Sequence, residues 1–320
     1  MVPPIEPPSV TTATSSARRW VSIGVVIVLL AGMAIYLSGR QDEIANIRRV
    51  SIGVLLAACA LQFASQVFQN ASLLVPLQAS VATLGFWELM LVRTGGFLVG
   101  SVVPVVGGPG VRLAYLRTKG VSYVDFTWAT LFSNVLALGA AALLAAACTV
   151  VLWMIAGRPP GFVLGVLASV LAVSAGTIVA FESLPRVTGY RWFRKWHWLS
   201  GMTGFAMRGR MTATVFAYAL LRHVLNFATF GLLYQALSRQ PGDFLAGGLV
   251  YALTSPLRMV NVTPANLGIV EWFVALVGKA LAFDVATGLI VALAFRGIGL
   301  IAQGLCALVG SLWLALRPRR

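Results

Sequence analysis

The sequence predicts an all-α polytopic membrane protein with about six full spans and two broken re-entrant helical hairpins, arranged as an inverted repeat. Hydrophobic residues make up 59% of the 320-residue chain and charged residues only 10%, with a mean hydropathy of +0.88. Several apolar runs reach the roughly 20 residues that cross the hydrocarbon core as a helix. Two more apolar regions are interrupted by proline and glycine, which a bilayer tolerates only where the broken backbone is buried in protein or lines a cavity.

The full spans are the uninterrupted apolar runs, each long enough to cross as one helix. We expect them at about residues 20–38, 50–69, 124–155, 161–182, 211–237 and 285–316. The interrupted regions cover about residues 84–120 and 244–282. We interpret each as a hairpin, because this explains why several glycines stand in the middle of the first region.

The remaining segments are short and polar. Residues 1–19 are rich in proline, serine and threonine, which predicts a disordered cytoplasmic tail. Residues 20–316 form a single transmembrane domain. Within it, residues 183–210 are predicted to be a cytoplasmic loop whose interleaved basic and aromatic side chains suit an anionic membrane surface. Residues 317–320 form a basic cytoplasmic tail.

The distribution of positive charge places both termini on the cytoplasmic side, since basic residues are retained there. Arg18 and Arg19 precede the first span without a small-residue cleavage site after it, so this span should remain uncleaved. Arg40, Arg48 and Arg49 fall on an outer loop and disagree with this orientation. We attribute the net charge of +15 to cytoplasmic loops and expect no nucleic-acid binding. The chain is therefore expected to be a multi-pass protein of the bacterial inner membrane.

Each interrupted region contains a similar elbow. The first reads Pro104-Val-Val-Gly-Gly108-Pro-Gly-Val-Arg112, and the second reads Pro264-Ala-Asn-Leu-Gly268-Ile-Val-Glu271. Both run Pro-x-x-x-Gly and then present one charged residue, basic in the first copy and acidic in the second. The prolines could be plain kinks, but the repeated spacing favours a functional break.

The two elbows and their flanking spans predict an internal repeat. The units cover about residues 50–155 and 211–316, with an offset of about 160 residues between matching features. Counting the crossings makes the second elbow enter from the face opposite to the first. The units would then be related by a pseudo-twofold axis in the membrane plane, and the elbows would meet near the midplane.

Charges within the apolar segments indicate the class of ligand. Five arginines lie in or beside these segments: Arg93, Arg112, Arg222, Arg258 and Arg296. Against them stand Glu88 and Glu271, with two aspartates nearer the ends. Buried charges must be paired or bind a counter-ion, so an anionic guest is a natural partner for the excess arginines. Guanidinium groups match phosphate oxygens in a bidentate way, which favours a phosphate-bearing lipid headgroup.

Each of these residues also has a structural interpretation. Arg112 and Glu271 could form a buried ion pair across the pseudo-twofold axis. Arg93 and Arg258 could extend to the membrane interface instead of contacting a headgroup. A mid-span histidine such as His223 is more often an interhelical hydrogen-bonding group than a proton relay. Asn261 and Asn266 flank Pro264. We expect Asn266 to cap the helix that begins near Gly268.

Cofactor chemistry finds no support in the sequence. Cys59, Cys148 and Cys306 lie inside apolar runs without metal-type spacing, and we interpret them as packing residues that form no disulfide. No metal motif, P-loop or dinucleotide fingerprint is present in the sequence, so we expect no cofactor. An intramembrane enzyme is the weakest hypothesis, since only Glu271 with His223 could be imagined as its site.

At the elbows the chain resembles the lysylphosphatidylglycerol synthase transmembrane-region family, a flippase-like membrane domain. The matching residues are Pro104-x-x-Gly107-Gly108-x-x-x-Arg112 with Gly120 after it, and Pro264-x-x-Leu267-Gly268-x-x-Glu271 with Arg296 in the closing span. The resemblance covers residues from about 20 to 316 and implies a stand-alone member without the cytoplasmic aminoacyl-transferase domain. The family often has an acidic–basic pair where this chain has Phe132-Ser133-Asn134, so coupling or substrate choice could differ.

We therefore expect a translocator of an anionic phospholipid or a polyprenyl-phosphate-linked lipid, and not an enzyme. The alternative is a non-transporting accessory subunit for a membrane glycosyltransferase or a lipid-modifying enzyme. The expected substrate-binding residues are Arg112, Glu271, Arg296, Pro104, Gly107, Gly108, Pro264, Asn266 and Gly268, with Arg93, Arg222, His223 and Arg258 as secondary candidates.

Overall fold

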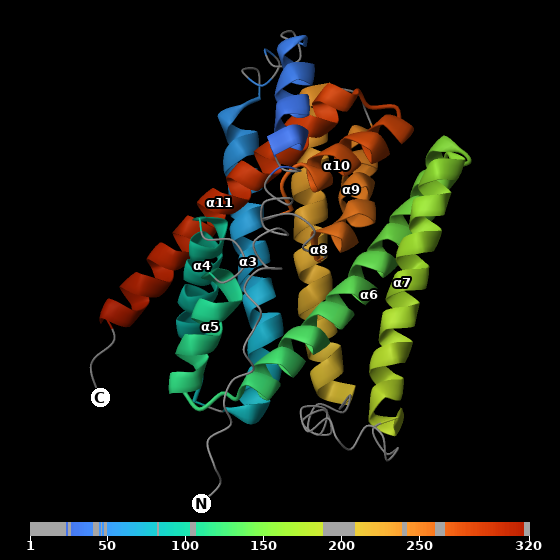
Figure 1. Cartoon of the computed structure of the whole chain (residues 1–320). Coiled ribbons are helices and arrows are strands. Elements are labelled where there is room, and N and C mark those ends of the chain that lie inside the picture. Colours follow the sequence, from blue (N-terminus) through green and yellow to red (C-terminus); the bar gives the residue numbers. More distant parts are fainter. Residues whose placement is uncertain are drawn as a thin grey trace, which may run out of the picture.

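A computed structural model of the chain describes residues 27–40, 50–81, 83–102, 107–187, 209–238, 242–259 and 266–316, together with positions 24, 45 and 47. Its described residues form helices and no strands (Figure 1), which confirms the predicted all-α polytopic class. Residues 1–19 and 317–320, most of the predicted loop 183–210, and the elbow residues Pro104, Asn261 and Pro264 lie outside the described residues.

Among the described residues, five helices are long and apolar enough to cross a membrane. They are α3 (Ile52–Ser80), α6 (Tyr123–Ala156), α7 (Gly161–Val187), α8 (Gly209–Ser238) and α11 (Val285–Leu316). They correspond to five of the six predicted spans. The sixth prediction, at residues 20–38, coincides with a shorter apolar helix at Ile27–Ser38.

Local sequence explains where several of these helices begin and end. The Ser51 hydroxyl accepts a hydrogen bond from the Val54 N–H at the start of α3. Ser122 accepts in the same way from the Asp125 N–H at the start of α6. Such caps satisfy N–H groups that the first helical turn leaves free. The long helix α6 ends at Gly157, whose φ of +84° suits glycine, and two prolines follow.

Each interrupted region folds as two short helices separated by the elbow. The first contains α4 (Phe86–Val102) and α5 (Gly107–Thr118). The second contains α9 (Asp243–Thr254), which continues into the 3₁₀ turn η3 (Ser255–Met259), and then α10 (Ile269–Ala280). The four α-helices have 17, 12, 12 and 12 residues, compared with the roughly 20 residues of a typical full crossing.

The element order repeats along the chain. A long helix, a short helix, an elbow, a short helix and a long helix occur first as α3 to α6 and again as α8 to α11. In Figure 1, α4 and α5 occupy the lower half of the bundle, whereas α9 and α10 occupy the upper half.

Packing crosses between these two sets of helices. The helices α3 and α8 pack against each other along the centre of the bundle. The closing helix of the first set, α6, packs on α8 and α9 of the second set. Likewise α11 packs on α3 and α4 of the first set. Each set therefore supplies the outer helix that covers the opening helices of the other.

Small residues bring α9 unusually close to α8. A Cβ atom at Gly248 would lie 2.3 Å from the ring of Phe227, and one at Gly247 would lie 2.5 Å from the Cβ of Tyr234. A side chain at either position would overlap these aromatic residues, so glycine permits the close approach without a shift of the ring or the helix. This close approach places Tyr251 of α9 among the buried aromatic side chains of α8 and α11, beside the central cavity.

Candidate functional site

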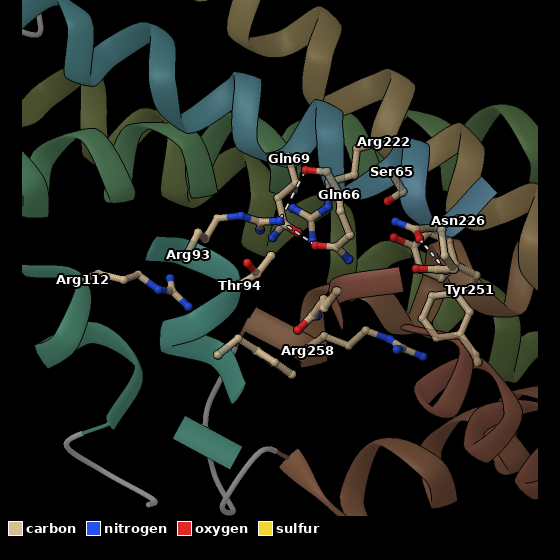
Figure 2. Close-up of a pocket in the computed structure, with 14 residues that line it drawn as sticks. Ser65, Gln66, Gln69, Arg93, Thr94, Arg112, Arg222, Asn226, Tyr251 and Arg258 are labelled. Atoms are coloured by element: carbon tan, nitrogen blue, oxygen red, sulfur yellow. Dashed lines mark hydrogen bonds between the residues drawn. The ribbon is translucent and has the colours of Figure 1, made fainter. Parts of the chain in front are cut away.

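A polar cavity of about 260 Å³ lies at the centre of the bundle, between α3 and the two elbow regions (Figure 2). A second cavity of about 200 Å³ shares six of its lining residues and continues toward Arg296 and Asn266. In Figure 2 the labelled side chains converge on this space from several helices. The first cavity is lined by Gln62, Ser65, Gln66, Gln69, Arg93, Thr94, Phe97, Arg112, Arg222, Asn226, Tyr251, Arg258, Phe295 and Gln303.

The charge of this lining is entirely positive. Four arginines contribute to the first cavity and Arg296 to the second, whereas no described lining residue of either cavity is a carboxylate. Arg93 lies close enough to Arg112 and Arg222 for each of them to repel it electrostatically. Because like charges in a poorly solvated site destabilise one another, this arrangement favours an anion in the space between them.

Arg93 is held in place by the central helix. Its Nη2 atom donates to the Gln66 side-chain oxygen at 2.6 Å and to the Gln66 carbonyl at 3.3 Å. The residue is only 7% exposed and faces the cavity, so the expectation that it extends to the membrane interface is wrong. The neutral Gln66 amide fixes the guanidinium without neutralising it.

Arg258 is held by aromatic rings instead. Its guanidinium carbon lies 4.8 Å from the ring centroid of Phe295, 5.3 Å from that of Phe230 and 5.8 Å from that of Tyr251. These cation–π contacts keep the side chain inside the bundle, so it does not extend to the interface either. Tyr251 is fixed in turn by His223, whose Nδ1 lies 3.0 Å from the Tyr251 hydroxyl. Of the two interpretations of His223, the structure therefore shows the buried hydrogen-bonding group between two helices.

Several hydrogen-bonding atoms around the cavity have no partner among the described residues. They include Nε of Arg93 and of Arg112, Nε and Nη2 of Arg258, and Oε1 of Gln303. Buried polar atoms in native proteins are nearly always satisfied by protein, water or ligand. The arginine atoms are donors that need acceptors, whereas the Gln303 oxygen is an acceptor that needs a donor.

Glu271 serves the second elbow rather than the cavity. One carboxylate oxygen lies 2.6 Å from Nη2 of Arg296, and the other accepts from the Gly268 N–H at 2.7 Å. Glu271 is the third residue of α10, so its side chain reaches back to the start of its own helix. The alternative of an Arg112–Glu271 ion pair is therefore not what the structure shows. Arg296 reaches Glu271 because α11 packs along α10, whereas Arg112 belongs to the other elbow region.

Asn266 connects this elbow to two of the arginines. Its side-chain nitrogen donates to the Arg258 carbonyl at 3.3 Å, and its own carbonyl accepts from Arg296 at 3.4 Å. The residue has a φ of +54°, a left-handed conformation that asparagine tolerates better than most residues. We expected Asn266 to cap α10, but it is Glu271 that accepts the Gly268 N–H at the start of this helix.

In the first elbow region, Gly107 and Gly108 form the start of α5, which carries Arg112 to the cavity. The other acidic residue, Glu88, lies apart from the lining. It accepts hydrogen bonds from Tyr115 and from Lys119, whose Nζ lies 2.7 Å away. This contact clips α4 to α5 and keeps the carboxylate out of the arginine cluster.

The polar residues of α3 were missed from the sequence. Gln62, Gln66 and Gln69 have the i, i+4, i+7 spacing of one helical face, and Ser65 lies on the same face. All four line the cavity. Glutamines at this spacing in an otherwise apolar helix are the signal that could have identified them. Asn226 follows Arg222 at i+4 in α8 and Gln303 follows Arg296 at i+7 in α11, so each shares a helical face with an arginine that the sequence did single out.

The family comparison covers both elbow regions. The model of the lysylphosphatidylglycerol synthase TM region matches residues 19–307. The chain belongs to this family. No curated protein matches the chain. The match includes every residue that lines the two cavities, so the arginine cluster lies within the family's membrane region. At Phe132-Ser133-Asn134, where the family often has an acidic–basic pair, Ser133 donates to the Ser72 carbonyl at 3.0 Å and connects α6 to α3.

Proposed function

We propose that this member of the lysylphosphatidylglycerol synthase TM-region family moves an anionic lipid between the leaflets of the bacterial inner membrane. The observation that carries the proposal is the central cavity, in which four arginines and no described carboxylate line one space. A phosphate group would supply the missing negative charge. It would also supply acceptors for the arginine nitrogens that have no partner among the described residues.

The outer surface near the cavity favours a lipid over a water-soluble anion. Phe97 of α4 and Leu300 of α11 both line the second cavity, and they are 38% and 41% exposed. A large apolar side chain that is exposed on a membrane-spanning bundle faces lipid. A headgroup could therefore occupy the arginine cluster while its acyl or polyprenyl chains remain in the bilayer beside these residues.

The two elbow regions provide a route between leaflets. The cavity is lined from both of them, by Arg112 of α5 and by Arg258 of η3. We infer that the two helix sets form an inverted repeat with re-entrant elbows and cytoplasmic termini. Movement of one elbow region relative to the other would then expose the arginines to each leaflet in turn. In this mechanism Glu271 holds Arg296 and the α10 terminus and does not contact the headgroup.

The test is translocation of fluorescent phosphatidylglycerol in proteoliposomes, measured by quenching of the outer leaflet with dithionite, with and without a proton gradient. Arg93→Gln and Arg222→Gln should each slow translocation about tenfold or more, because a hydrogen bond to a charged group contributes about 1.5–3 kcal/mol. Arg158→Gln is the matched control, since Arg158 is exposed outside the bundle. Wild-type rates in both cavity variants would show that the headgroup site is misplaced.

The accessory-subunit alternative predicts a different result. The purified protein would then retain lipid in native mass spectrometry but would not translocate it under either condition. A membrane glycosyltransferase or lipid-modifying enzyme that remains bound through purification would support this alternative.

A further inference from the structure

The cavity has two chemically different walls. One carries the arginines described above. The other is neutral and polar, and it consists of the α3 face with Gln62, Ser65 and Gln66, together with Asn226 of α8 and Gln303 of α11. A site for phosphate alone has no need of this second wall, because phosphate oxygens accept hydrogen bonds and the arginines already supply donors.

Most amides on this wall have a hydrogen-bond partner within the protein. Gln62 donates to the Asn226 side-chain oxygen at 2.8 Å, and the Gln66 oxygen accepts from Arg93. Gln303 differs, because its Oε1 atom is buried and has no donor among the described residues. A phosphodiester carries no proton to donate to this oxygen. The complementary group on a ligand is therefore a hydroxyl or an N–H.

Charge distinguishes between these two kinds of donor. An ammonium group in this cavity would face four arginines without a carboxylate in the described lining to compensate it. Glu271 is already paired with Arg296, and Glu88 with Lys119. Like charges at short range in a poorly solvated cavity are strongly unfavourable. A neutral hydroxyl meets no such repulsion.

We propose that the cavity selects lipids whose headgroup joins a phosphate to free hydroxyl groups, as in glycerol-type or sugar-type headgroups, and rejects headgroups that bear an amine. This inference rests on the proposed anionic-headgroup site and specifies its ligand. The phosphate lies among Arg93, Arg112 and Arg222, and a hydroxyl donates to Oε1 of Gln303.

The experiment is a lipid-binding competition by native mass spectrometry of the full-length protein in detergent. Phosphatidylglycerol and phosphatidylethanol form the matched pair, since both are singly charged phosphodiesters and only the former has hydroxyls. Lysylphosphatidylglycerol is the amine-bearing probe. We expect phosphatidylglycerol to bind about tenfold more tightly than phosphatidylethanol, because one buried acceptor is satisfied by only one of them. Phosphatidylglycerol should also bind more tightly than lysylphosphatidylglycerol, by at least the same factor.

Two substitutions at one position test the assignment to Gln303. Gln303→Met keeps a similar volume and removes the acceptor, so it should abolish the preference for phosphatidylglycerol over phosphatidylethanol. Gln303→Glu adds a carboxylate, so it should raise the relative binding of lysylphosphatidylglycerol. A preference that survives Gln303→Met would overturn the role of this residue.

The outcomes separate this inference from the proposed function. Equal binding of phosphatidylglycerol and phosphatidylethanol, with both lost in Arg222→Gln, would overturn the hydroxyl selection and leave the anion site intact. Equal binding of lysylphosphatidylglycerol would overturn the rejection of amines. If Arg222→Gln changes none of these affinities, the anion site itself is wrong. Competition by glycerol 3-phosphate as effective as that of the lipid would identify a soluble ligand and contradict selection of a lipid.

Discussion

The contact between Glu271 and Arg296 should be a major source of stability in the second elbow. Glu271 is only 1% exposed, and its two oxygens satisfy the Arg296 guanidinium at 2.6 Å and the Gly268 N–H at 2.7 Å. Removing one partner of a fully buried ion pair costs about 3–5 kcal/mol. Arg296 is 27% exposed and also donates to Asn266, so Glu271→Ala should cost less, about 2–3 kcal/mol. Glu271→Gln keeps an acceptor for the Gly268 N–H and should cost about 1 kcal/mol.

Thermal unfolding in detergent, followed by tryptophan fluorescence, measures this difference. At about 2–4 °C per kcal/mol, Glu271→Ala should lower Tm by about 5–10 °C and Glu271→Gln by about 2–4 °C. Glu182→Ala, at an exposed acidic residue of α7, is the control and should change Tm little. The effect of Glu271→Ala should shrink in an Arg296→Met background, because no uncompensated cation remains. An unchanged Tm for Glu271→Ala, or an equal loss in the Arg296→Met background, would refute the reasoning.

Two further predictions concern helix packing and pH. Gly248→Ala should destabilise the protein by about 1–3 kcal/mol, because the new methyl group overlaps the Phe227 ring. The control Gly304→Ala places its methyl group in open space and should be neutral or slightly stabilising. Equal Tm values for the two variants would contradict close packing of α9 on α8. Burial alone would raise the pKa of Glu88, but hydrogen bonds from Lys119 and its other partners hold that pKa below the ordinary value of 4.5. The stabilisation that ionised Glu88 provides should be present above pH 4.5 and be lost as the pH falls through the lowered pKa. The acid-induced unfolding profiles of wild type and Glu88→Gln should therefore converge at low pH.

The order of the membrane helices could be predicted from the sequence because length and hydropathy determine it. The runs predicted at 124–155 and 285–316 end within a residue or two of α6 and α11. The run predicted at 50–69 stops 11 residues short of the end of α3 at Ser80. The polar side chains of this helix begin at Gln62 and include Asn70 and Gln78, and they lower the local hydropathy. The four α3 residues that line the cavity lie inside the predicted run, so it was the polar residues beyond Gln69 that made the span look short.

The members of the candidate site could be predicted in part. All five arginines that the sequence singled out line one of the two cavities, because charge in an apolar segment must face the protein interior. The partner of Glu271 could not be chosen from among them, since each arginine offers the same group. The register of α10 against α11 selects Arg296. Likewise, only the folded structure shows that Arg258 lies on aromatic rings from three different positions in the chain.

The crossed packing of α6 and α11 has a consequence for biosynthesis. When the first half of the chain leaves the ribosome, the face of α6 that later contacts α8 and α9 has no protein to cover it. The helices α3 and α4 must likewise wait for α11, which follows them in the chain after α5 to α10. Neither half can complete its own interior, so this bundle closes only after α11 has entered the membrane. Until then, the faces of α3, α4 and α6 that pack on the other set stay without their protein partners.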